Sequence, residues 1–567
     1  MLNDVRRRSP GGNRISFLPL AREITVPTGA SVVAAAAEAG LTLDSPCERG
    51  GLCGACKLRF IEGAPEPSPW DRLHFDPREL EEGWRLACRA DVPSDALVSV
   101  PRQAPYLRLE DHSYPYRLSP PAQRARVRAS ASTVPPDARG LLPTAALGEQ
   151  PRELTLEVVG DQVRDIRLGW RECDRLGVAV CVQGDQIGGW LLDLNSGEQL
   201  SAATGRLIGG SEPAEGGAES ISAATRRLVR SLCVQARKGS DLVSDIVVLG
   251  GSGEEAVDSE GRPLRAVGQG NEALSNLAAA SAVAACPPGC GTTVLLSLDP
   301  YPWAMYLEGD EAWLTGTPMP GLGIGELVRP DAPGAVRHIS LAPEVELGYE
   351  SGPPTGLSLS AAVDGVAELW RAGLINHRGA LLRRDSAPSS LTPEIRERLA
   401  GPEDEAVFRL WGAEGNGALN LRQGHVRFVQ RLKALLACAW ESVLEQAGVE
   451  TEHLDRVVLV GEAAASLRVR SAVAVGLLPP VSTAIVQVQG PAAGMGARLA
   501  LLSTQAGKDI ARLSRECRRV PVPDVSKPGW AERLYLGTPA SGRGLDAQEG
   551  ALLDFRSRGS VGIGRRA

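Results

Sequence analysis

The stretch Cys47-Glu48-Arg49-Gly50-Gly51-Leu52-Cys53-Gly54-Ala55-Cys56 holds three cysteines within ten residues, and Cys88 follows after 31 further residues. Three thiolates on one tight loop and a distant fourth thiolate are the ligand arrangement of plant-type [2Fe–2S] sites. Such a loop wraps around the cluster and aims its amide N–H groups at the sulfur atoms, so it has little room for side chains. Glycine meets that demand, and three of the ten residues are glycines. We therefore predict one [2Fe–2S] cluster with four ligands: Cys47, Cys53, Cys56 and Cys88.

Two other interpretations of these cysteines remain open. A structural zinc site favours two Cys-x-x-Cys pairs, whereas only Cys53 and Cys56 form such a pair here. The other alternative is four buried cysteines without a metal. Five residues separate Cys47 from Cys53, one more than in plant ferredoxins, so the spacing is closer to that of adrenodoxin-like proteins. We favour the [2Fe–2S] interpretation over both alternatives.

The residues around the loop predict the domain that carries it. Two short segments, Arg14–Leu20 and Arg22–Val26, read as a β-hairpin. Ser31 then suits the N-cap of a helix over Val32–Ala39, and Gly40 is placed to end that helix. Further strand signals follow the cysteine loop. Strand, strand, helix and further strands are the order of a β-grasp domain.

Composition and charge restrict the class of protein. The net charge of −7 gives no reason to expect a nucleic-acid partner or a membrane surface. No apolar run reaches the roughly 18 residues that cross a bilayer, and the segment after Arg6–Arg8 lacks the apolar core of an export signal. We therefore expect a cytoplasmic protein, in which the eleven cysteines do not form a disulfide framework.

At 567 residues the chain exceeds one hydrophobic core, and we predict a multidomain α/β protein. The clearest helical pattern spans 426–447, where apolar residues recur every three or four positions, and Gly448 is its natural end. A Pro- and Ser-rich region without periodicity indicates a linker. The predicted segments are a flexible tail (1–13), the [2Fe–2S] ferredoxin-type domain (14–102), the linker (103–150), a small intermediate module (151–175), a large α/β domain (176–537) and a disordered tail (538–567).

The remaining cysteines carry weaker signals. Cys286-Pro-Pro-Gly-Cys290 could bind a metal or form a redox pair, but an incidental turn is the favoured interpretation because no histidine or further cysteine lies nearby in sequence. The other five are most simply small buried residues; they are Cys173, Cys181, Cys233, Cys438 and Cys517. The six histidines do not cluster, and we predict none of them as a ligand or base.

The order of segments resembles that of the reductive activators of corrinoid proteins. Members of that family join a [2Fe–2S] ferredoxin domain to an ATPase domain of the actin, sugar kinase and Hsp70 type. The resemblance covers most of the chain, and it implies that the large domain has two ribonuclease H-like lobes. The stretches that carry it are Val26–Ser31, Leu43–Cys47, Gly51–Cys56, Leu191–Leu194, Asp364–Ile375, Gly476–Pro479 and Gly490–Leu502.

The chain departs from this family at the nucleotide site. Such ATPases hold phosphate with backbone N–H groups of two β-hairpin turns and organise Mg²⁺ with a carboxylate. Cys181 stands at the expected carboxylate position, and two prolines remove amide donors from the second turn, Ser297–Pro302. On the adenosine side, Gly461-Glu462-Ala463-Ala464 places a negative charge where small residues are expected, and Leu359-Ser360-Ala361 replaces a Gly-Ser-Gly turn. We therefore expect that ATP hydrolysis has been lost.

Three hypotheses for the function follow. In the first, the chain takes an electron from a donor protein and reduces the cobalt(II) corrinoid of a methyltransferase's corrinoid protein to cobalt(I). In the second, the large domain is a pseudo-ATPase docking module, and the cluster serves a non-corrinoid reductase or oxygenase. In the third, the nucleotide site is rearranged and the chain remains an ATP-dependent activator. We rank them in this order and predict no catalytic side chain.

Overall fold

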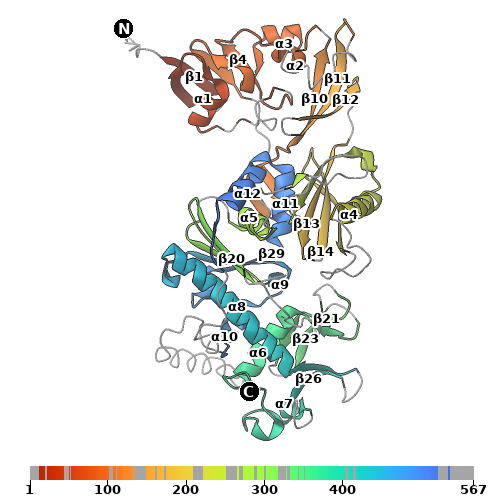
Figure 1. The fold of residues 1–567 in the computed structure, drawn as a ribbon, viewed down its shortest axis with the longest axis vertical. Coiled ribbons are helices and arrows are strands. Elements are labelled where there is room, and N and C mark those ends of the chain that lie inside the picture. Colours follow the sequence, from red (N-terminus) through yellow and green to blue (C-terminus); the bar gives the residue numbers. More distant parts are fainter. Residues whose placement is uncertain are drawn as a thin grey trace, which may run out of the picture. The chain divides into compact units, whose positions relative to one another are not determined.

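The structure is a computed structural model, and the chain forms two compact units (Figure 1). Unit 1 comprises residues 1–267 and 497–510, and unit 2 comprises residues 268–496 and 511–567. The residues that the structure describes are 12–18, 22–41, 43, 50–51, 53–100, 106–109, 112–130, 132–134, 148–159, 162–170, 174–184, 186–207, 221–250, 265–266, 273–286, 290–298, 302–316, 327–328, 332–341, 344–349, 352–401, 406–412, 417–521 and 534–536.

Unit 1 begins with a five-stranded sheet of order β2-β1-β7-β4-β5. Its strands are β1 (Gly12–Leu18), β2 (Arg22–Pro27), β4 (Lys57–Glu62), β5 (Trp84–Leu86) and β7 (Ala96–Ser99). β1 runs antiparallel to β2 and parallel to β7. Ile15 and Phe17 lie on one face of β1, where both are fully buried. The predicted hairpin and β-grasp arrangement are therefore confirmed.

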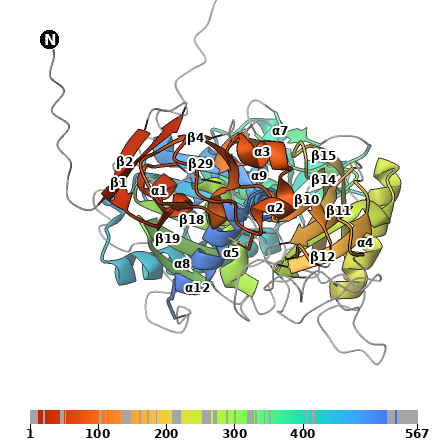
Figure 2. The same ribbon diagram turned by 90° about the horizontal axis from the view of Figure 1, so that it is seen from above.

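Short elements complete this domain: β3 (Ala30–Ser31), α1 (Val32–Glu38), α2 (Asp71–His74), α3 (Pro77–Glu81), η1 (Ala87–Arg89) and β6 (Asp91–Val92). α1 confirms the predicted helix and lies beside β1 and β2 in Figures 1 and 2. Gly40 follows it with a φ of 72°, which suits glycine at the end of a helix. Ser31 occupies the N-cap position, as predicted, although its side chain makes no capping hydrogen bond.

Strands also lie inside the region where the sequence predicts a linker, residues 103–150. β8 (Tyr106–Leu109) pairs with β9 (His112–Arg117), and β10 (Ala122–Ala129) starts a three-stranded sheet with β11 (Arg152–Val159) and β12 (Gln162–Leu168). Ala125, Val127 and Ala129 of β10 pack into the same core as the β-grasp domain. Arg126 and Arg128 alternate with them on the other face, so the segment has the period-2 pattern of a strand.

The next sheet of unit 1 has the order β15-β14-β13-β16-β17. Its elements are β13 (Leu176–Gln183), β14 (Gln186–Asp193), β15 (Gln199–Arg206), β16 (Val243–Leu249), β17 (Arg265–Ala266) and the helix α4 (Ile221–Ala236). The first three strands form an antiparallel meander, and β16 pairs in parallel with β13. A meander whose first strand borders parallel strands is the ribonuclease H-like arrangement.

Unit 2 repeats this order in the run β20-β19-β18-β28-β29. Its strands are β18 (Thr293–Ser297), β19 (Trp303–Glu308), β20 (Glu311–Gly316), β28 (Arg456–Val460), β29 (Val486–Gly490) and the edge strand β30 (Arg518–Arg519). The long helix α8 (Gln423–Ala447) packs on β19 and β20 and ends at Gly448, whose φ is 71°. The helix predicted over 426–447 is therefore confirmed, although it begins three residues earlier.

The other α-helices that follow residue 268 in the described sequence are α5 (Ala273–Ala285), α6 (Leu359–Arg371), α7 (Pro393–Glu397), α9 (Glu462–Ala465), α10 (Val469–Val475), α11 (Ala492–Leu502) and α12 (Thr504–Glu516). Small sheets pair β21 (Ala335–Val336) with β24 (Gly356–Leu357), β22 (His338–Ser340) with β23 (Glu346–Gly348), and β25 (Leu399–Ala400) with β26 (Val407–Trp411) and β27 (Leu419–Arg422).

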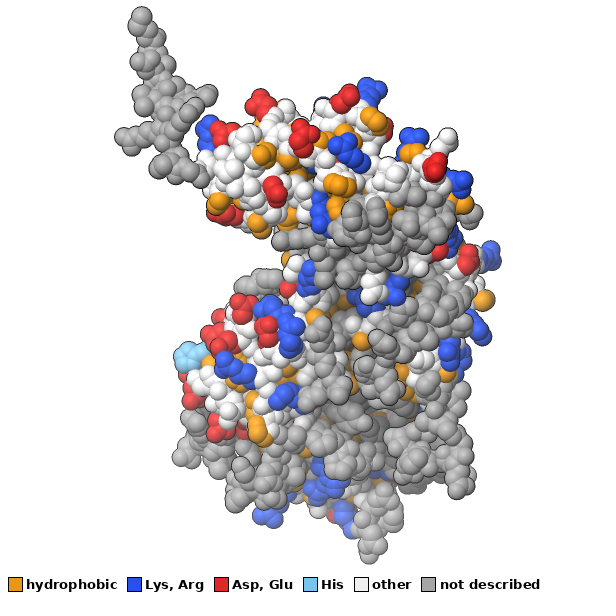
Figure 3. Space-filling view, turned by 45° about the horizontal axis from the view of Figure 1, so that its top comes forward, with side chains coloured by type: hydrophobic (Ala, Val, Ile, Leu, Met, Phe, Trp, Pro, Cys, Tyr) orange, Lys and Arg blue, Asp and Glu red, His pale blue; other side chains and the backbone are white. Residues whose placement is uncertain are grey.

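The described surface carries charges of both signs. Figure 3 shows acidic and basic side chains interspersed on the face in view, in keeping with the net charge of −7. None of the helices within the described residues is both long and apolar enough to span a bilayer.

Candidate metal centre

Three of the four predicted cluster ligands lie within the described residues. Cys53 and Cys56 precede β4 and are buried, with 5% and 4% of their surface exposed. Cys88 lies in η1, directly after β5, and is half-buried. Cys47 lies outside the described residues.

A strand pair brings the segment of Cys88 to the loop of Cys56. β4 and β5 are antiparallel, and Lys57 stands opposite Leu86. Just beyond this pair, the N–H of Ala87 donates to the carbonyl of Cys56 at 2.9 Å. Cys56 and Cys88 therefore lie at the same end of the β4–β5 pair, although 31 residues separate them in sequence.

The backbone of the cysteine loop requires glycine at two positions. Gly51 and Gly54 have φ values of 76° and 66°, a region that other L-residues enter only at a cost. A Cβ on Gly54 would lie 2.9 Å from Nδ1 of His74, and one on Gly51 would lie 2.9 Å from Nε of Arg89. These glycines thus provide both the turn and the space for neighbouring side chains.

Two side chains that do not belong to the loop, those of His74 and Arg89, hydrogen-bond its backbone. Nε2 of His74 lies 2.9 Å from the carbonyl oxygen of Gly51, and Nη2 of Arg89 donates to the carbonyl of Gly50 at 2.8 Å. The Arg89 guanidinium also lies 4.7 Å from the centre of the Trp70 ring, a cation–π distance. Burial, which outweighs the hydrogen bond to Gly51, lowers the pKa of His74 to about 4, with a further lowering from Lys57. His74 is therefore neutral near pH 7 and, facing a carbonyl, carries its proton on Nε2.

Asp71 fixes the strand end that leads to Cys88. Its carboxylate is buried and accepts the N–H of Leu86 at 2.7 Å, together with the N–H and the hydroxyl of Ser68 at 2.8 and 2.7 Å. Asp71, His74 and Arg89 were not predicted from the sequence. Arg89 could have been suspected because it directly follows Cys88. Nothing near Asp71 or His74 in sequence indicated them, because their contacts with the cysteine loop and with the end of β5 join residues that are distant in sequence.

The residues present fit an iron–sulfur cluster. The N–H of Ala55 points to Sγ of Cys53 at 3.5 Å, which is the kind of amide-to-sulfur contact that tunes such centres. Thiolate ligands on a glycine-rich loop, largely shielded from water, also suit that cofactor. Within the described residues no three His, Cys, Asp or Glu side chains form a metal site by themselves, and the predicted fourth ligand is outside them.

In the described part of the first hairpin of the expected nucleotide site, a cysteine stands at the expected carboxylate position. β13 and β14 form that hairpin, and Cys181 lies buried in β13 opposite Gly188. Burial raises the pKa of the Cys181 thiol to about 12. A neutral thiol cannot supply the negative charge that organises Mg²⁺. Asp185, in the turn, lies outside the described residues.

The other expected nucleotide loops use their backbone donors within the protein. The N–H of Gly461 donates to the carbonyl of Gly490 at 2.6 Å, and α9 begins directly afterwards at Glu462. Ser358 caps α6 and accepts the N–H of Ala361 at 3.2 Å. The turn of the second hairpin includes residues 299–301, which lie outside the described residues.

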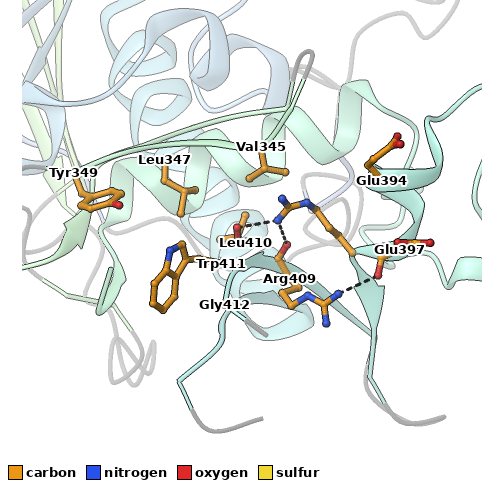
Figure 4. A pocket seen from close by; sticks show the side chains of 10 residues that line it. Val345, Leu347, Tyr349, Glu394, Glu397, Arg409, Leu410, Trp411 and Gly412 are labelled. Carbon is orange, nitrogen blue, oxygen red and sulfur yellow. Dashed lines mark hydrogen bonds between the residues drawn. The ribbon is translucent and has the colours of Figure 1, made fainter. Parts of the chain in front are cut away.

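Unit 2 also contains a pocket of about 760 Å³ that the sequence did not predict (Figure 4). Val345, Leu347 and Tyr349 line one side of it, and Trp411 is 40% exposed at its edge. The guanidinium of Arg398 donates to the carbonyls of Arg409 and Leu410 at 3.2 and 3.0 Å. The positive charge of Arg398 is thus hydrogen-bonded to backbone carbonyls that line the pocket, and we assign no reaction to this pocket.

Two family models match the chain. Residues 17–92 match the 2Fe-2S iron-sulfur cluster binding domain. Residues 329–525 match the model described as the C-terminal domain of RACo, the ASKHA domain. The predicted [2Fe–2S] cofactor, the fold class and the resemblance to reductive activators of corrinoid proteins are thereby confirmed. The chain carries an electron-transfer domain of the ferredoxin type, whereas the assignment of its four ligands stays a prediction.

Individual proteins are similar to parts of the chain. One component of the Na(+)-translocating NADH-quinone reductase, its F chain, is 39% identical over 80 residues in Actinobacillus pleuropneumoniae serotype 5b and 38% identical over 80 residues in Pseudomonas aeruginosa. Each match covers 14% of this chain and 20% of that reductase component, so the chain spans about a fifth of the length of these curated relatives. The solved structure of a reductive activator for a corrinoid, iron-sulfur protein aligns with a TM-score of 0.58 and 16% identity, covering 92% of this chain and 97% of that one. That likeness concerns the fold.

Proposed function

We propose that the chain passes an electron from its [2Fe–2S] cluster to the cobalt(II) corrinoid of a methyltransferase's corrinoid protein, and so returns it to cobalt(I). The observation that carries this proposal is the union, in one chain, of a 2Fe-2S domain over residues 17–92 and an ASKHA domain matched over residues 329–525. The first domain provides the redox centre, and the second provides the surface on which an acceptor docks.

We further propose that Cys47, Cys53, Cys56 and Cys88 are the cluster ligands. The β4–β5 pair supports this assignment because it places Cys88 beside the loop of Cys56. The cluster, when bound, supplies a one-electron carrier. The chain's own residues shield it from water and aim the Ala55 amide at a ligand sulfur.

ATP hydrolysis plays no part in this proposal. Three observations support this. The Cys181 thiol is neutral, the N–H of Gly461 already donates to a backbone carbonyl, and the first turn of α6 is already capped. These groups therefore do not supply the charge and the free donors that nucleotide chemistry needs. Docking of the acceptor then has to gate the transfer, by excluding water from the cobalt and by bringing it near the cluster.

A kinetic experiment tests the electron transfer. The chain is reduced anaerobically with dithionite, freed of excess reductant and mixed with a cobalt(II) corrinoid methyltransferase protein, and the cobalt(II) absorbance is followed. We expect rapid loss of that absorbance with the wild type. Cys56→Ser, which cannot hold the cluster normally, should lose this activity, whereas Cys438→Ser, a change far from the loop in sequence, should retain it. Absence of any acceleration by the wild type would contradict the proposal.

A second candidate function is electron delivery to a non-corrinoid reductase or oxygenase. The similarity of the ferredoxin-type domain to one component of a quinone reductase favours it over a nucleotide-driven activator. The same reduced chain distinguishes the candidates: reoxidation by a corrinoid protein supports the first. Reoxidation by a flavin reductase or oxygenase component alone, with cobalt(II) unchanged, supports the second.

A further inference from the structure

The cysteine loop contains buried backbone donors that have no acceptor within the described part of the chain. Gly51 and Gly54 are both buried, and the N–H of neither donates a hydrogen bond to a described residue. The N–H of Ala55, next to Gly54, points to Sγ of Cys53 at 3.5 Å. Buried N–H groups without an acceptor are rare because each costs free energy. Two of them on one loop that carries thiol ligands indicate that the loop directs its donors at a ligand.

Covalent geometry gives the direction of the first of these donors. In a trans peptide group, the form that bonds not involving proline adopt, the carbonyl and the N–H that follows it point in opposite directions. The carbonyl of Gly50 accepts a hydrogen bond from Nη2 of Arg89 at 2.8 Å. The N–H of Gly51 belongs to the same peptide group, so it points away from Arg89. The arginine thus holds the carbonyl on one side of the loop and turns the buried donor to the other side.

The guanidinium of Arg89 is itself held in place. It lies 4.7 Å from the centre of the Trp70 ring, and Trp70 is 6% exposed. Its backbone lies in η1, directly after Cys88, and the N–H of Ala87 at the start of η1 donates to the carbonyl of Cys56 at 2.9 Å. A cation–π contact and a charge-assisted hydrogen bond therefore fix the same side chain against the loop. This arrangement favours one orientation of the Gly50–Gly51 peptide group.

His74 makes the corresponding contact with the next carbonyl. Its Nε2 lies 2.9 Å from the carbonyl oxygen of Gly51. Burial lowers the pKa of this imidazole to about 4, so it is a neutral donor near pH 7. A hydrogen bond from a charged donor is roughly twice as strong as one between neutral groups. Arg89 therefore polarises the loop backbone more than His74 does, and it also brings a positive charge.

Donors and positive charge both favour the reduced state of an iron–sulfur centre. Reduction adds one negative charge, and hydrogen bonds to the sulfur atoms together with nearby cations stabilise that charge. A peptide group whose carbonyl already accepts a hydrogen bond is also a stronger donor at its N–H, because hydrogen bonds in a chain polarise one another. Arg89 therefore acts on the centre in two ways, through its charge and through the peptide group that it holds.

We propose that Arg89 is a positioning residue for the [2Fe–2S] cluster, which turns the N–H of Gly51 toward a cluster sulfur and so raises the reduction potential. His74 contributes in the same direction, by a smaller amount, through the carbonyl of Gly51. The inference rests on the proposed binding of the cluster by this loop and on no property of the electron acceptor. If Arg89 served only the fold of the loop, its loss would lower cluster retention or the melting temperature and leave the potential unchanged.

An optical redox titration of the cluster-loaded full chain tests this inference without an acceptor protein. Arg89→Met removes the charge and the donors but keeps an unbranched apolar side chain beside Trp70. We expect a lower midpoint potential for Arg89→Met and a smaller lowering for His74→Leu. The matched control is Arg22→Met, which removes the same charge from β2, at the opposite edge of the sheet from β5, and should titrate at the wild-type potential. A wild-type midpoint in cluster-loaded Arg89→Met would overturn the proposal.

Pulsed EPR of the reduced cluster separates the positioning effect from the effect of charge. After exchange into D₂O, amide deuterons that are hydrogen-bonded to cluster sulfurs couple to the unpaired electron. Arg89→Lys keeps the positive charge but loses the planar, stacked guanidinium, so we expect a weaker deuteron coupling than in the wild type. An unchanged coupling would contradict the positioning role.

The test does not depend on one variant. If Arg89→Met holds no cluster, Arg89→Lys and His74→Leu replace it, and wild-type potentials in both would overturn the proposal. Both measurements are made without a corrinoid protein, so a failure to reduce cobalt(II) and a failure of this inference are separate results.

Discussion

Two side chains, His74 and Arg89, hydrogen-bond the backbone of the cysteine loop. Each donates a hydrogen bond to a glycine carbonyl of the loop, and each occupies the space that a side chain on Gly54 or Gly51 would need. The loop therefore depends on glycine for two reasons, backbone conformation and packing. These two reasons can be separated by experiment.

Gly54→Ala should weaken both the fold and the cluster site. An L-residue at the φ of 66° costs about 1–2 kcal/mol, and the new Cβ additionally meets Nδ1 of His74 at 2.9 Å. The matched control is Gly40→Ala, where φ is 72° and no atom lies within 4 Å of the built Cβ. We expect lower cluster absorbance and a lower melting temperature for Gly54→Ala than for Gly40→Ala. Equal behaviour of the two variants would refute the packing argument.

Lys433 gives a prediction on pH. Its side chain is fully buried in α8, its Nζ donates to the carbonyl of Tyr535, and burial lowers its pKa to about 7. Between pH 7 and 10 the unfolded chain therefore binds a proton at Lys433 that the folded chain has released, so this residue makes stability rise with pH. Below pH 7 both states are protonated and the cost of burial is fully present.

The variant Lys433→Met removes this proton linkage. The stability difference between the wild type and the variant should shift in favour of the wild type by on the order of 1 kcal/mol for each pH unit from 7 upward. Chemical denaturation of both proteins at pH 7, 8 and 9 measures this difference. A difference that stays constant over this range would show that Lys433 titrates normally in the folded chain.

At the scale of elements, the end of β5 positions the last predicted ligand. Asp71 of α2 accepts the N–H of Leu86, two residues before Cys88. Asp71→Ala leaves the buried N–H of Leu86 and the part-buried N–H of Ser68 without this acceptor, and the loss at Leu86 alone costs about 1–3 kcal/mol. We expect severalfold faster loss of the cluster absorbance on dilution into a chelator.

Asp76→Ala is the control for that measurement. Asp76 caps α3 and accepts the N–H of Glu79, so its loss costs about 1 kcal/mol without touching the segment of Cys88. The cluster should be lost from this variant at the wild-type rate. If Asp71→Ala and Asp76→Ala lose it equally fast, Asp71 has no specific role in positioning Cys88.

Elements with strong local signals could be predicted from the sequence. The β1–β2 hairpin, α1 and α8 follow from alternation, heptad-like spacing and glycine at helix ends. β10 was not predicted although Ala125 and Val127 alternate with arginines, because its short period-2 pattern lies within a Pro- and Ser-rich region that reads as a linker. The anchors of the cysteine loop were missed for another reason: the His74–Gly51 and Leu86–Asp71 contacts span 23 and 15 residues, and no local pattern encodes them.

At the scale of the molecule, two sheets have the same strand order, and we propose that neither serves ATP hydrolysis. The order β15-β14-β13-β16-β17 in unit 1 corresponds to β20-β19-β18-β28-β29 in unit 2. The sheets of the fold are present, whereas Cys181 and Glu462 stand where the family resemblance leads us to expect a carboxylate and a small residue. Fold and catalysis are separable properties of the sequence.

Nucleotide turnover should therefore be absent. We expect titration calorimetry with Mg-ATP to give no heat of turnover, and phosphate release to stay at the level of a protein-free control. The measurement uses the cluster-loaded full chain. Tight binding together with measurable hydrolysis would mean that the loops around Cys181, Ser358 and Gly461 form a rearranged but active site.

The most direct test of the central claim is an anaerobic optical titration of a cobalt(II) corrinoid methyltransferase protein with the reduced chain, run with and without Mg-ATP. Free cob(II)alamin serves as the acceptor without a docking surface. We predict that loss of the cobalt(II) absorbance tracks reoxidation of the cluster, electron for electron, and is unchanged by Mg-ATP. A cluster that stays reduced beside unchanged cobalt(II), or a transfer that occurs only with Mg-ATP, would contradict this account.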